Sequence, residues 1–451
     1  RGLKGKYLIT LQNTTIQPAI DQLKNRALRE RVYKASIERN QGGKYDNTAL
    51  VSQIAELRAK VAELMGYPDY ASYSLADESA VNPQAVNAML GQLGPAALAK
   101  AQAEAADIQA AIDAEAKAAG KPSFKLEPWD WSFYASQARK ARFSISEDEI
   151  KPYFELNNVL NNGIFGVANS LYGLTFKERA DLPVYNPDVR VFEVFNADGS
   201  PLSLFVFDPY KRDNKKGGAW MSNYVDQAGL FNRKPIIANN LNVAKPAAGQ
   251  PALLSFDEVE TMFHEFGHAL HGMLSDVKYP LLSGTNVPRD FVEYLSQVNE
   301  MWVREPETLN RFARHYKTGQ PMPKDLMDKL VNSVTYGQGF TTTEYVAAAM
   351  VDQSWHQIPS SAAPKAKDVM AFEKASLVKN AIDYAPVPPR YHSPYFAHAF
   401  SGGYSAGYYA YIWSEVLARD TGKWFHTHGG LSRANGDYFR AKVLSRGRTM
   451  E

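Results

Sequence analysis

The segment HEFGH, at residues 264–268, constrains the fold and chemistry of this chain more than any other stretch. Two histidines four residues apart on a helix project from the same side one turn apart, so both imidazoles can reach one metal ion. In hydrolytic sites of this kind, the glutamate beside them is not a ligand; it takes a proton from water and passes it to the leaving group. The pattern therefore predicts a helix with His264 and His268 as metal ligands and Glu265 as the proton acceptor.

The flanking residues predict a buried helix from Phe256 to Leu274. Ser255 and Glu258 have the spacing of a capping box, which closes a first helical turn. Apolar residues cover broad faces of the segment: Val259, Met262, Phe263, Phe266, Leu270, Met273 and Leu274. The same histidine pattern arises by chance in exposed helices, but here unpaired charge would lie in apolar surroundings, where it is costly. We therefore favour a catalytic site.

A metal site with two histidines needs a third protein ligand. Glu293, in the segment PRDFVEYLSQVNE, is the candidate. The alternative is that Asp290 caps the next helix and Glu293 is its capping-box partner, which the three-residue spacing also allows. Spacing alone does not decide between the two interpretations.

Two segments, FHEFGHALHGML and LSGTNVPRDFVEYLSQVNEMW, are similar to the thimet oligopeptidase family of zinc peptidases. The resemblance runs along essentially the whole chain and implies one Zn²⁺ per chain, with Glu293 as the third ligand. Other segments resemble the bacterial peptidyl-dipeptidases of this family more than its endo-acting mammalian members: KRDNKKGGAWMSNYV, KPAAGQPALLSFDEV and PPRYHSPYFAHAFSGGYSAGYYAYIWSEV. His398 and Tyr404 are six residues apart, one more than in the mammalian members.

The resemblance also implies roles for residues in the Gly- and Tyr-rich stretch near the C-terminal end. Tyr404 and Tyr411 match tyrosines that stabilise the oxyanion, and His398 matches a histidine that contacts the substrate. The alternative is that the tyrosines are packing residues. Because a fork of arginine N–H donors suits a terminal carboxylate, Arg289 and Arg390 are candidates to bind it, with a structural ion pair as the alternative for each.

Three further residues of the two predicted helices have weaker signals. His271 shares a helix face with His268 but lies about 10 Å along the axis from His264, so we expect a packed histidine. Glu260 and Glu300 are candidates to orient the metal ligands, although either one is equally a candidate for an ordinary solvated carboxylate.

Together these features predict a zinc metallopeptidase that hydrolyses short peptides and releases dipeptides from their C-termini. The alternatives are an endo-acting oligopeptidase and a noncatalytic peptide-binding relative. Retention of His264, His268, Glu265 and Glu293 argues against the noncatalytic relative.

We expect a mainly α-helical fold with a deep substrate channel and a small antiparallel β-sheet beside the active-site helix. Residues 13–121 have apolar residues recurring at three and four positions, which predicts helices. Strands are predicted at Val189–Phe195, at residues 201–208 and at Lys234–Val243. We expect residues 1–125 to form a helical region that walls the channel, and residues 126–451 to form the catalytic region.

Composition limits the partners and the compartment. A net charge of +2 with dispersed basic residues argues against nucleic acid, and apolar runs are too short to span a membrane. The absence of cysteine excludes disulfides and fits either a cytoplasmic or a periplasmic protein. Because the chain begins at Arg1 and the resemblance implies further residues at both ends, we interpret it as the catalytic portion of a longer, monomeric protein.

Overall fold

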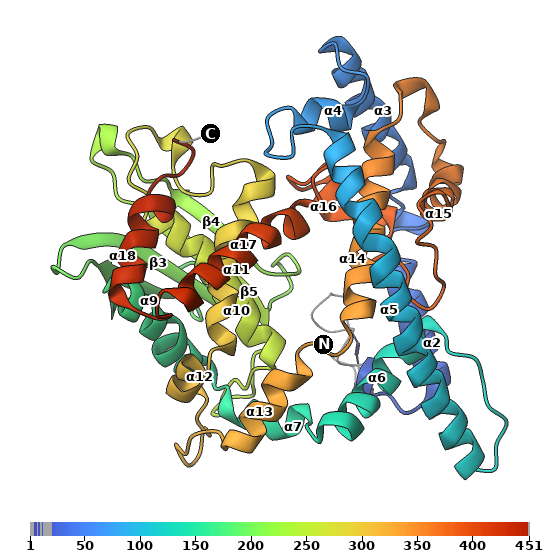
Figure 1. Ribbon diagram of the computed structural model, residues 1–451, viewed down its shortest axis with the longest axis horizontal. Coiled ribbons are helices and arrows are strands. Elements are labelled where there is room, and N and C mark those ends of the chain that lie inside the picture. Colours follow the sequence, from blue (N-terminus) through green and yellow to red (C-terminus); the bar gives the residue numbers. More distant parts are fainter. Residues whose placement is uncertain (1–3, 7, 10, 12–19, 450–451) are drawn as a thin grey trace. The chain divides into compact units, whose positions relative to one another are not determined.

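The computed structural model describes residues 4–6, 8, 9, 11 and 20–449, and its contacts divide the chain into two compact units (Figure 1). The first, here called the helical unit, comprises Arg1–Ser144 and Asn332–Ala410. The second, the sheet unit, comprises Ile145–Val331 and Tyr411–Glu451. Each unit is described by itself. Residues 13–19 of the predicted helical region lie outside the described part of the chain.

The helical unit is built around two long helices that lie side by side, α5 (Pro83–Ala118) and α14 (Gln338–His356) (Figure 1). Asn82 caps α5 through its side chain by accepting from Ala85 N. Small residues let the two backbones approach closely, since a Cβ at Gly339 would lie 2.5 Å from Ala101 N. The helices predicted in this part of residues 13–121 are therefore present and packed.

Other helices of this unit are α2 (Arg26–Ile37), α3 (Thr48–Leu64), α4 (Tyr70–Leu75), α6 (Pro128–Phe143), α15 (Val369–Lys379) and α16 (Ala397–Phe400). Helix α6 belongs here because Asp130, which is fully buried, accepts hydrogen bonds from Arg26 and Arg29 of α2. The contacts place residues 126–144 in the helical unit. The predicted boundary after residue 125 divided the channel wall from the catalytic region, and that division stays a prediction.

The sheet unit contains the two helices predicted around the histidine pattern, α10 (Phe256–Met273) and α11 (Arg289–Arg304). The remaining helices in or entering this unit include α7 (Glu147–Ile150), α8 (Leu156–Asn158), α9 (Phe165–Tyr172), α12 (Pro306–Phe312), α13 (Lys324–Ser333), α17 (Ala410–Thr427) and α18 (Arg433–Phe439). The mainly helical fold class is confirmed, and the substrate channel stays a prediction.

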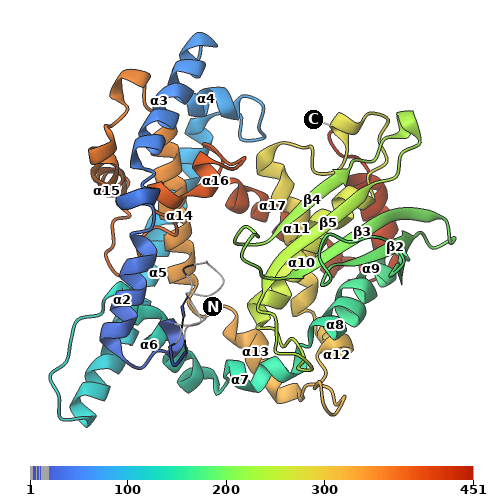
Figure 2. The same ribbon diagram turned by 180° about the vertical axis from the view of Figure 1, so that it is seen from behind.

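One five-stranded sheet lies beside α10 (Figure 2). Its strands, in the order β1-β2-β3-β5-β4, are β1 (Thr175–Glu178), β2 (Arg190–Phe195), β3 (Pro201–Tyr210), β5 (Ile236–Val243) and β4 (Trp220–Val225). The three predicted strands, β2, β3 and β5, are confirmed, and β2 and β3 pair as an antiparallel hairpin. The prediction of a wholly antiparallel sheet is wrong, because β3 and β5 pair in parallel. The chain reverses twice between them, through β4, before β5 enters between β3 and β4.

Alternation along the strands gives the sheet two different faces. On β3, Phe205 packs edge-on against Phe266 of α10, with ring centroids 5.3 Å apart. The next residue, Val206, faces the other way and joins a cluster with Val191 and Ala238. Because successive side chains of a strand point to opposite faces, this pattern fixes which face holds α10. The sheet is therefore the platform on which the histidine-bearing helix rests.

Candidate active site

Helix α10 begins and ends where the sequence predicts. Ser255 accepts from Glu258 N, and the Glu258 carboxylate accepts from Ser255 N, so the predicted capping box is present. Gly267 is the point of closest approach to α11: a Cβ there would lie 2.6 Å from Ser296 Cα and 2.7 Å from Leu295 O. Every other residue type at this position would push the two helices apart.

Two buried asparagines fix the middle of α10 through its carbonyl oxygens. Asn239 on β5 donates to Glu265 O at 2.7 Å, and Asn299 on α11 donates to Phe263 O at 2.7 Å. These bonds hold the helix between the sheet and α11. The sequence analysis did not identify either residue, because each partner lies more than twenty-five positions away and no local spacing connects them.

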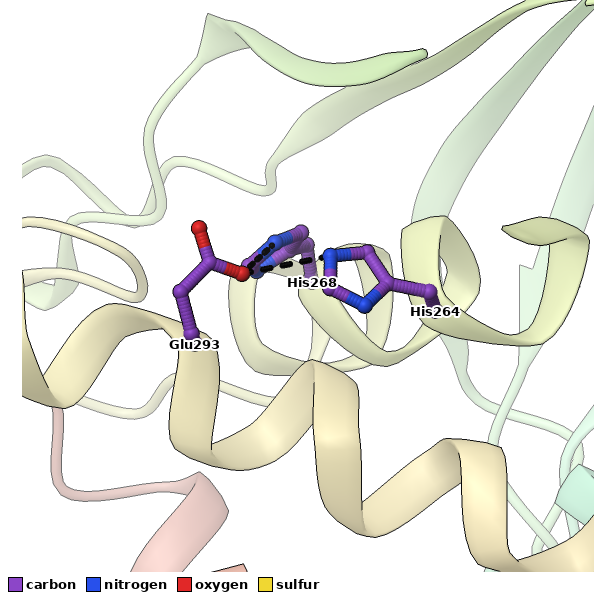
Figure 3. Close-up of side chains that lie close together, drawn as sticks. All are labelled: His264, His268 and Glu293. Carbon is purple, nitrogen blue, oxygen red and sulfur yellow. Dashed lines mark ion pairs between the residues drawn. The ribbon is translucent and has the colours of Figure 1, made fainter. Parts of the chain in front are cut away.

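The side chains of His264, His268 and Glu293 point toward one another (Figure 3). Glu293 Oε2 lies 3.2 Å from His264 Nε2 and 3.1 Å from His268 Nε2, and the three ligand atoms all lie within 4.8 Å of one another. Ligand bonds of about 2.1 Å in a tetrahedral zinc site place ligand atoms roughly 3.4 Å apart, which is close to these separations. The donor set of two imidazoles and one carboxylate also suits zinc.

Two neighbours orient two of these side chains, His264 and Glu293. Glu300 Oε1 lies 2.5 Å from His264 Nδ1, which leaves Nε2 of that ring to face Glu293. Ser296 donates to Glu293 Oε2 at 3.1 Å. Glu293, Ser296 and Glu300 are spaced by three and four positions on α11, so the period of a helix already places them on one side. Glu260, in contrast, pairs with Arg304.

The charges of the site favour a bound cation. Burial works against an ionised Glu293, but the adjacent His268 and His264 outweigh it and hold the pKa of Glu293 well below its usual range. Burial likewise opposes charge on His264, yet hydrogen bonds with Glu293 and Glu300 raise its pKa well above the usual value. The carboxylates therefore stabilise positive charge on His264, and a divalent ion bound by neutral imidazoles would supply that charge in place of the proton.

Glu265 is buried beside this cluster, with 5% of its surface exposed, and its Oε2 has no hydrogen-bond partner among the residues that the structure describes. Burial is the largest influence on this carboxyl and raises its pKa. An unpaired buried carboxylate is costly. Such a group suits proton transfer, because its basicity is raised and its lone pairs are available.

The capping-box alternative for Glu293 is wrong. Helix α11 begins at Arg289 after Pro288, so Asp290 lies inside the first turn, and Glu293 is too far along the helix to close a box with it. The N-cap residue of α11 is Pro288. The Glu293 carboxylate instead lies against the two histidines.

A family model described as "Peptidase family M3" matches residues 19–451. The chain belongs to peptidase family M3. Members of this family are metallopeptidases, which agrees with the resemblance that the sequence motifs indicated.

Two proteins from Escherichia coli K12 are similar in sequence to nearly the whole of this chain. The dipeptidyl carboxypeptidase is 47% identical over 448 residues, which cover 99% of this chain and 65% of that protein. Oligopeptidase A is 37% identical, again over 99% of this chain and 65% of that protein. The chain thus spans 65% of the length of each of these relatives.

The solved structure of PZ peptidase A with an inhibitor shares the M3 fold. It is 13% identical and superposes with a TM-score of 0.50, covering 96% of this chain and 65% of that one.

Among the described residues, no helix is long and apolar enough to cross a membrane.

The other predicted M3 site residues are divided between the two units. Tyr411 lies in the first turn of α17 in the sheet unit, where Gln297 of α11 donates to its carbonyl oxygen at 2.9 Å. His398, on α16, and Tyr404, in the following turn, lie in the helical unit with ring centroids 5.8 Å apart. The structure therefore brings His398 and Tyr404 together within one unit.

The two arginines have different surroundings. Arg289 is the first residue of α11, the helix that carries Glu293, and it is half-buried. Arg390 lies in the helical unit, with Nε 4.0 Å from Glu344 Oε1 and its backbone N–H donating to Glu344 O. This ion pair supports the structural alternative for Arg390.

His271 lies in the core, as predicted. It is 1% exposed, and burial lowers its pKa to about 3, so the ring is neutral. It is not part of the cluster of potential metal ligands found among the described residues.

Proposed function

We propose that this chain carries the catalytic site of a zinc metallopeptidase that releases dipeptides from the C-termini of short peptides. The observation that carries the proposal is the convergence of His264 Nε2, His268 Nε2 and Glu293 Oε2 on one point. Membership in family M3 and the identity of 47% to a dipeptidyl carboxypeptidase support the reaction class.

The reaction divides among the residues by their chemistry. A zinc ion held by His264, His268 and Glu293 would act as a Lewis acid toward the scissile carbonyl. Glu265 takes a proton from the attacking water and delivers it to the departing amine. The hydroxyl groups of Tyr404 and Tyr411 donate hydrogen bonds to the oxyanion, a contribution worth about 100- to 1,000-fold in rate for each donor.

Release of a dipeptide requires that the enzyme binds the terminal carboxylate at a fixed distance from the scissile bond. Arg289 is the better candidate of the two arginines, because it begins α11, the helix of the sheet unit that carries Glu293. His398 is proposed to contact the substrate. The first substrates to test are therefore short peptides with a free C-terminus, and the endo-acting alternative predicts no need for that carboxylate.

Metal analysis tests the proposed ligands directly. The purified protein should hold one zinc per chain, and Glu293→Ala should lower zinc affinity and activity together, since a ligand is lost. Glu307→Ala is the matched control, because Glu307 is an acid of the same unit that pairs with Arg311 instead. Unchanged zinc affinity in Glu293→Ala would remove Glu293 from the site.

A further inference from the structure

A buried polar network in the helical unit holds the loop that carries Tyr404. We call residues 401–409 the Tyr404 loop. At its centre, Asp352, on α14 and fully buried, accepts two backbone hydrogen bonds: Ala406 N donates to Oδ1 at 3.0 Å and Tyr408 N donates to Oδ2 at 2.9 Å. One carboxylate therefore fixes two peptide groups of the loop, and bonds to a charged acceptor are the stronger kind.

Two neighbours on α14 fix the carbonyl side of the same residues. Gln353 donates to Ala406 O at 2.6 Å, and the Tyr345 hydroxyl donates to Tyr408 O. Ala406 itself has a φ of 55°, in the left-handed region that a residue with a side chain rarely adopts. Such a conformation persists where its surroundings enforce it. Here four hydrogen bonds between α14 side chains and the Tyr404 loop enforce the conformation.

A histidine connects Arg58 with Asp352. Arg58 of α3 lies 2.9 Å from His356 Nε2, and since a guanidinium can only donate, Nε2 is the acceptor. His356 therefore carries its proton on Nδ1, which lies 2.8 Å from Asp352 O and 3.0 Å from Asp352 Oδ1. Arg58 also donates to Ala399 O at 2.7 Å, at the end of the helix that precedes the loop. All of these groups are buried or half-buried within the helical unit.

Tyr404 is coupled to this anchor through the backbone of a tight turn. Gly407 N donates to Tyr404 O at 3.0 Å, so the turn that contains Ala406 also contains Tyr404. On the other side, Tyr404 N donates to His398 O at 3.1 Å. A shift of Ala406 would therefore move both Tyr404 and its contact with His398.

We propose that Asp352 is a positioning residue: by holding the amides of Ala406 and Tyr408, it sets the place of the Tyr404 hydroxyl and so the rate of peptide hydrolysis. This inference rests on the proposed function, in which Tyr404 donates to the oxyanion. Asp352 does not touch the substrate and acts through the loop.

Hydrogen exchange tests the anchor without any assay of activity. Asp352→Asn keeps the size of the side chain but can accept with only one of its two polar atoms. In peptides spanning residues 401–410, amide exchange should become about tenfold faster or more, the effect of losing a bond to a charged group. Glu104→Gln is the matched control, because Glu104 accepts from Gly339 N and Phe340 N at the other end of α14. Its effect should stay at residues 339 and 340, and unchanged exchange of the loop in Asp352→Asn would overturn the inference.

Steady-state kinetics then tests the consequence for catalysis. Asp352→Asn should lower kcat by about 100-fold with little change in KM, as expected for a donor displaced by about 1 Å. The double variant Asp352→Asn/Tyr404→Phe should be no slower than the slower single variant, because both changes remove one contribution. If Asp352→Asn only destabilised the protein, the rate losses of the two single variants would multiply in the double variant. Asp352→Asn alone would then have kinetics like those of Glu104→Gln. Gln353→Met, which loses the bond to Ala406 O and the bond that Gln353 accepts from Gln357, replaces Asp352→Asn if that variant does not fold.

The outcomes separate the two proposals. One outcome is that Tyr404→Phe lowers kcat while Asp352→Asn keeps the kcat of Glu104→Gln. This outcome overturns the positioning role of Asp352 and leaves the proposed function standing. Wild-type turnover in Tyr404→Phe overturns the role of the Tyr404 hydroxyl, and with it the positioning role, even where exchange shows that the anchor exists.

Discussion

Glu265 and Glu293 are two buried carboxylates in one site whose surroundings give them opposite properties. Glu293 lies against two imidazoles, which stabilise its charged form and lower its pKa, and it accepts a hydrogen bond from Ser296. Glu265 has an oxygen without a partner among the described residues, and burial raises its pKa. When environments push the pKa values of two acids apart, the acids take different roles. At the scale of single residues, this separates the ligand from the proton acceptor.

The variant Glu265→Gln tests that separation. It keeps the size of the side chain but cannot take a proton, so kcat should fall by about 100- to 10,000-fold, the usual contribution of a general base and acid. Zinc content should stay at the wild-type level, since Glu265 is not a ligand. Near-normal turnover by a zinc-loaded variant would assign proton transfer to another group.

Glu300 provides a second test at this scale. Its carboxylate contacts His264 Nδ1, and loss of such a partner typically lowers metal affinity by about 10- to 100-fold. We expect Glu300→Gln to show this loss in competition with a zinc chelator. Glu260→Gln is the matched control, because Glu260 lies one turn before His264 and pairs with Arg304. Equal affinities in the two variants would assign Glu300 to packing.

The residues of the site differ in how far the sequence predicts them. His264, His268 and Glu265 follow from helical spacing, which local sequence contains. For Glu300, spacing left a solvated carboxylate equally open. Glu293 needed the family resemblance, because its spacing from Asp290 also fits a capping box. Asn239, Asn299 and Asp352 were not predicted, since their bonds connect elements that are distant in sequence.

At the scale of elements, the site depends on the close pairing of α10 and α11. Gly267 lets the two backbones touch, and the same approach brings Glu293 within reach of both histidines. The sequence predicted α10 from its apolar spacing and its capping box, whereas the cap considered for α11 at Asp290 was wrong. It missed β1 and β4, the two edge strands, because β1 is short and mostly exposed and β4 is half-buried along most of its length, so neither shows apolar alternation.

Gly267→Ala tests the pairing of these helices. Its Cβ would clash with Ser296 and Leu295, so we expect the free energy of unfolding to fall by about 1–3 kcal/mol, the usual cost of overpacking. Zinc affinity should fall as well, because Glu293 moves with α11. In the control Gly422→Ala on α17, the added Cβ meets Met301 at an ordinary 3.6 Å, and stability should not decrease. Urea unfolding compares the two variants, and an equally stable Gly267→Ala would contradict the close approach.

At the scale of the whole molecule, the proposed catalytic groups are distributed over both units. The sheet unit carries His264, His268, Glu293, Glu265 and Tyr411, and the helical unit carries His398 and Tyr404. The chain passes between the units at residues 144–145, 331–332 and 410–411. Composition and length did not predict this division, because each unit is assembled from segments that are far apart in the sequence.

The central claim is that the zinc site hydrolyses the second peptide bond from a free C-terminus. The most direct measurement is mass spectrometry of the products from an N-terminally blocked pentapeptide, supplied as the free acid and as the C-terminal amide. We predict a blocked tripeptide and a dipeptide from the free acid. Cleavage of the amide should be at least about tenfold slower, as expected for losing one charge-assisted bond. Equal rates on both peptides, with cuts at several internal bonds, would contradict dipeptide release and favour an endo-acting oligopeptidase.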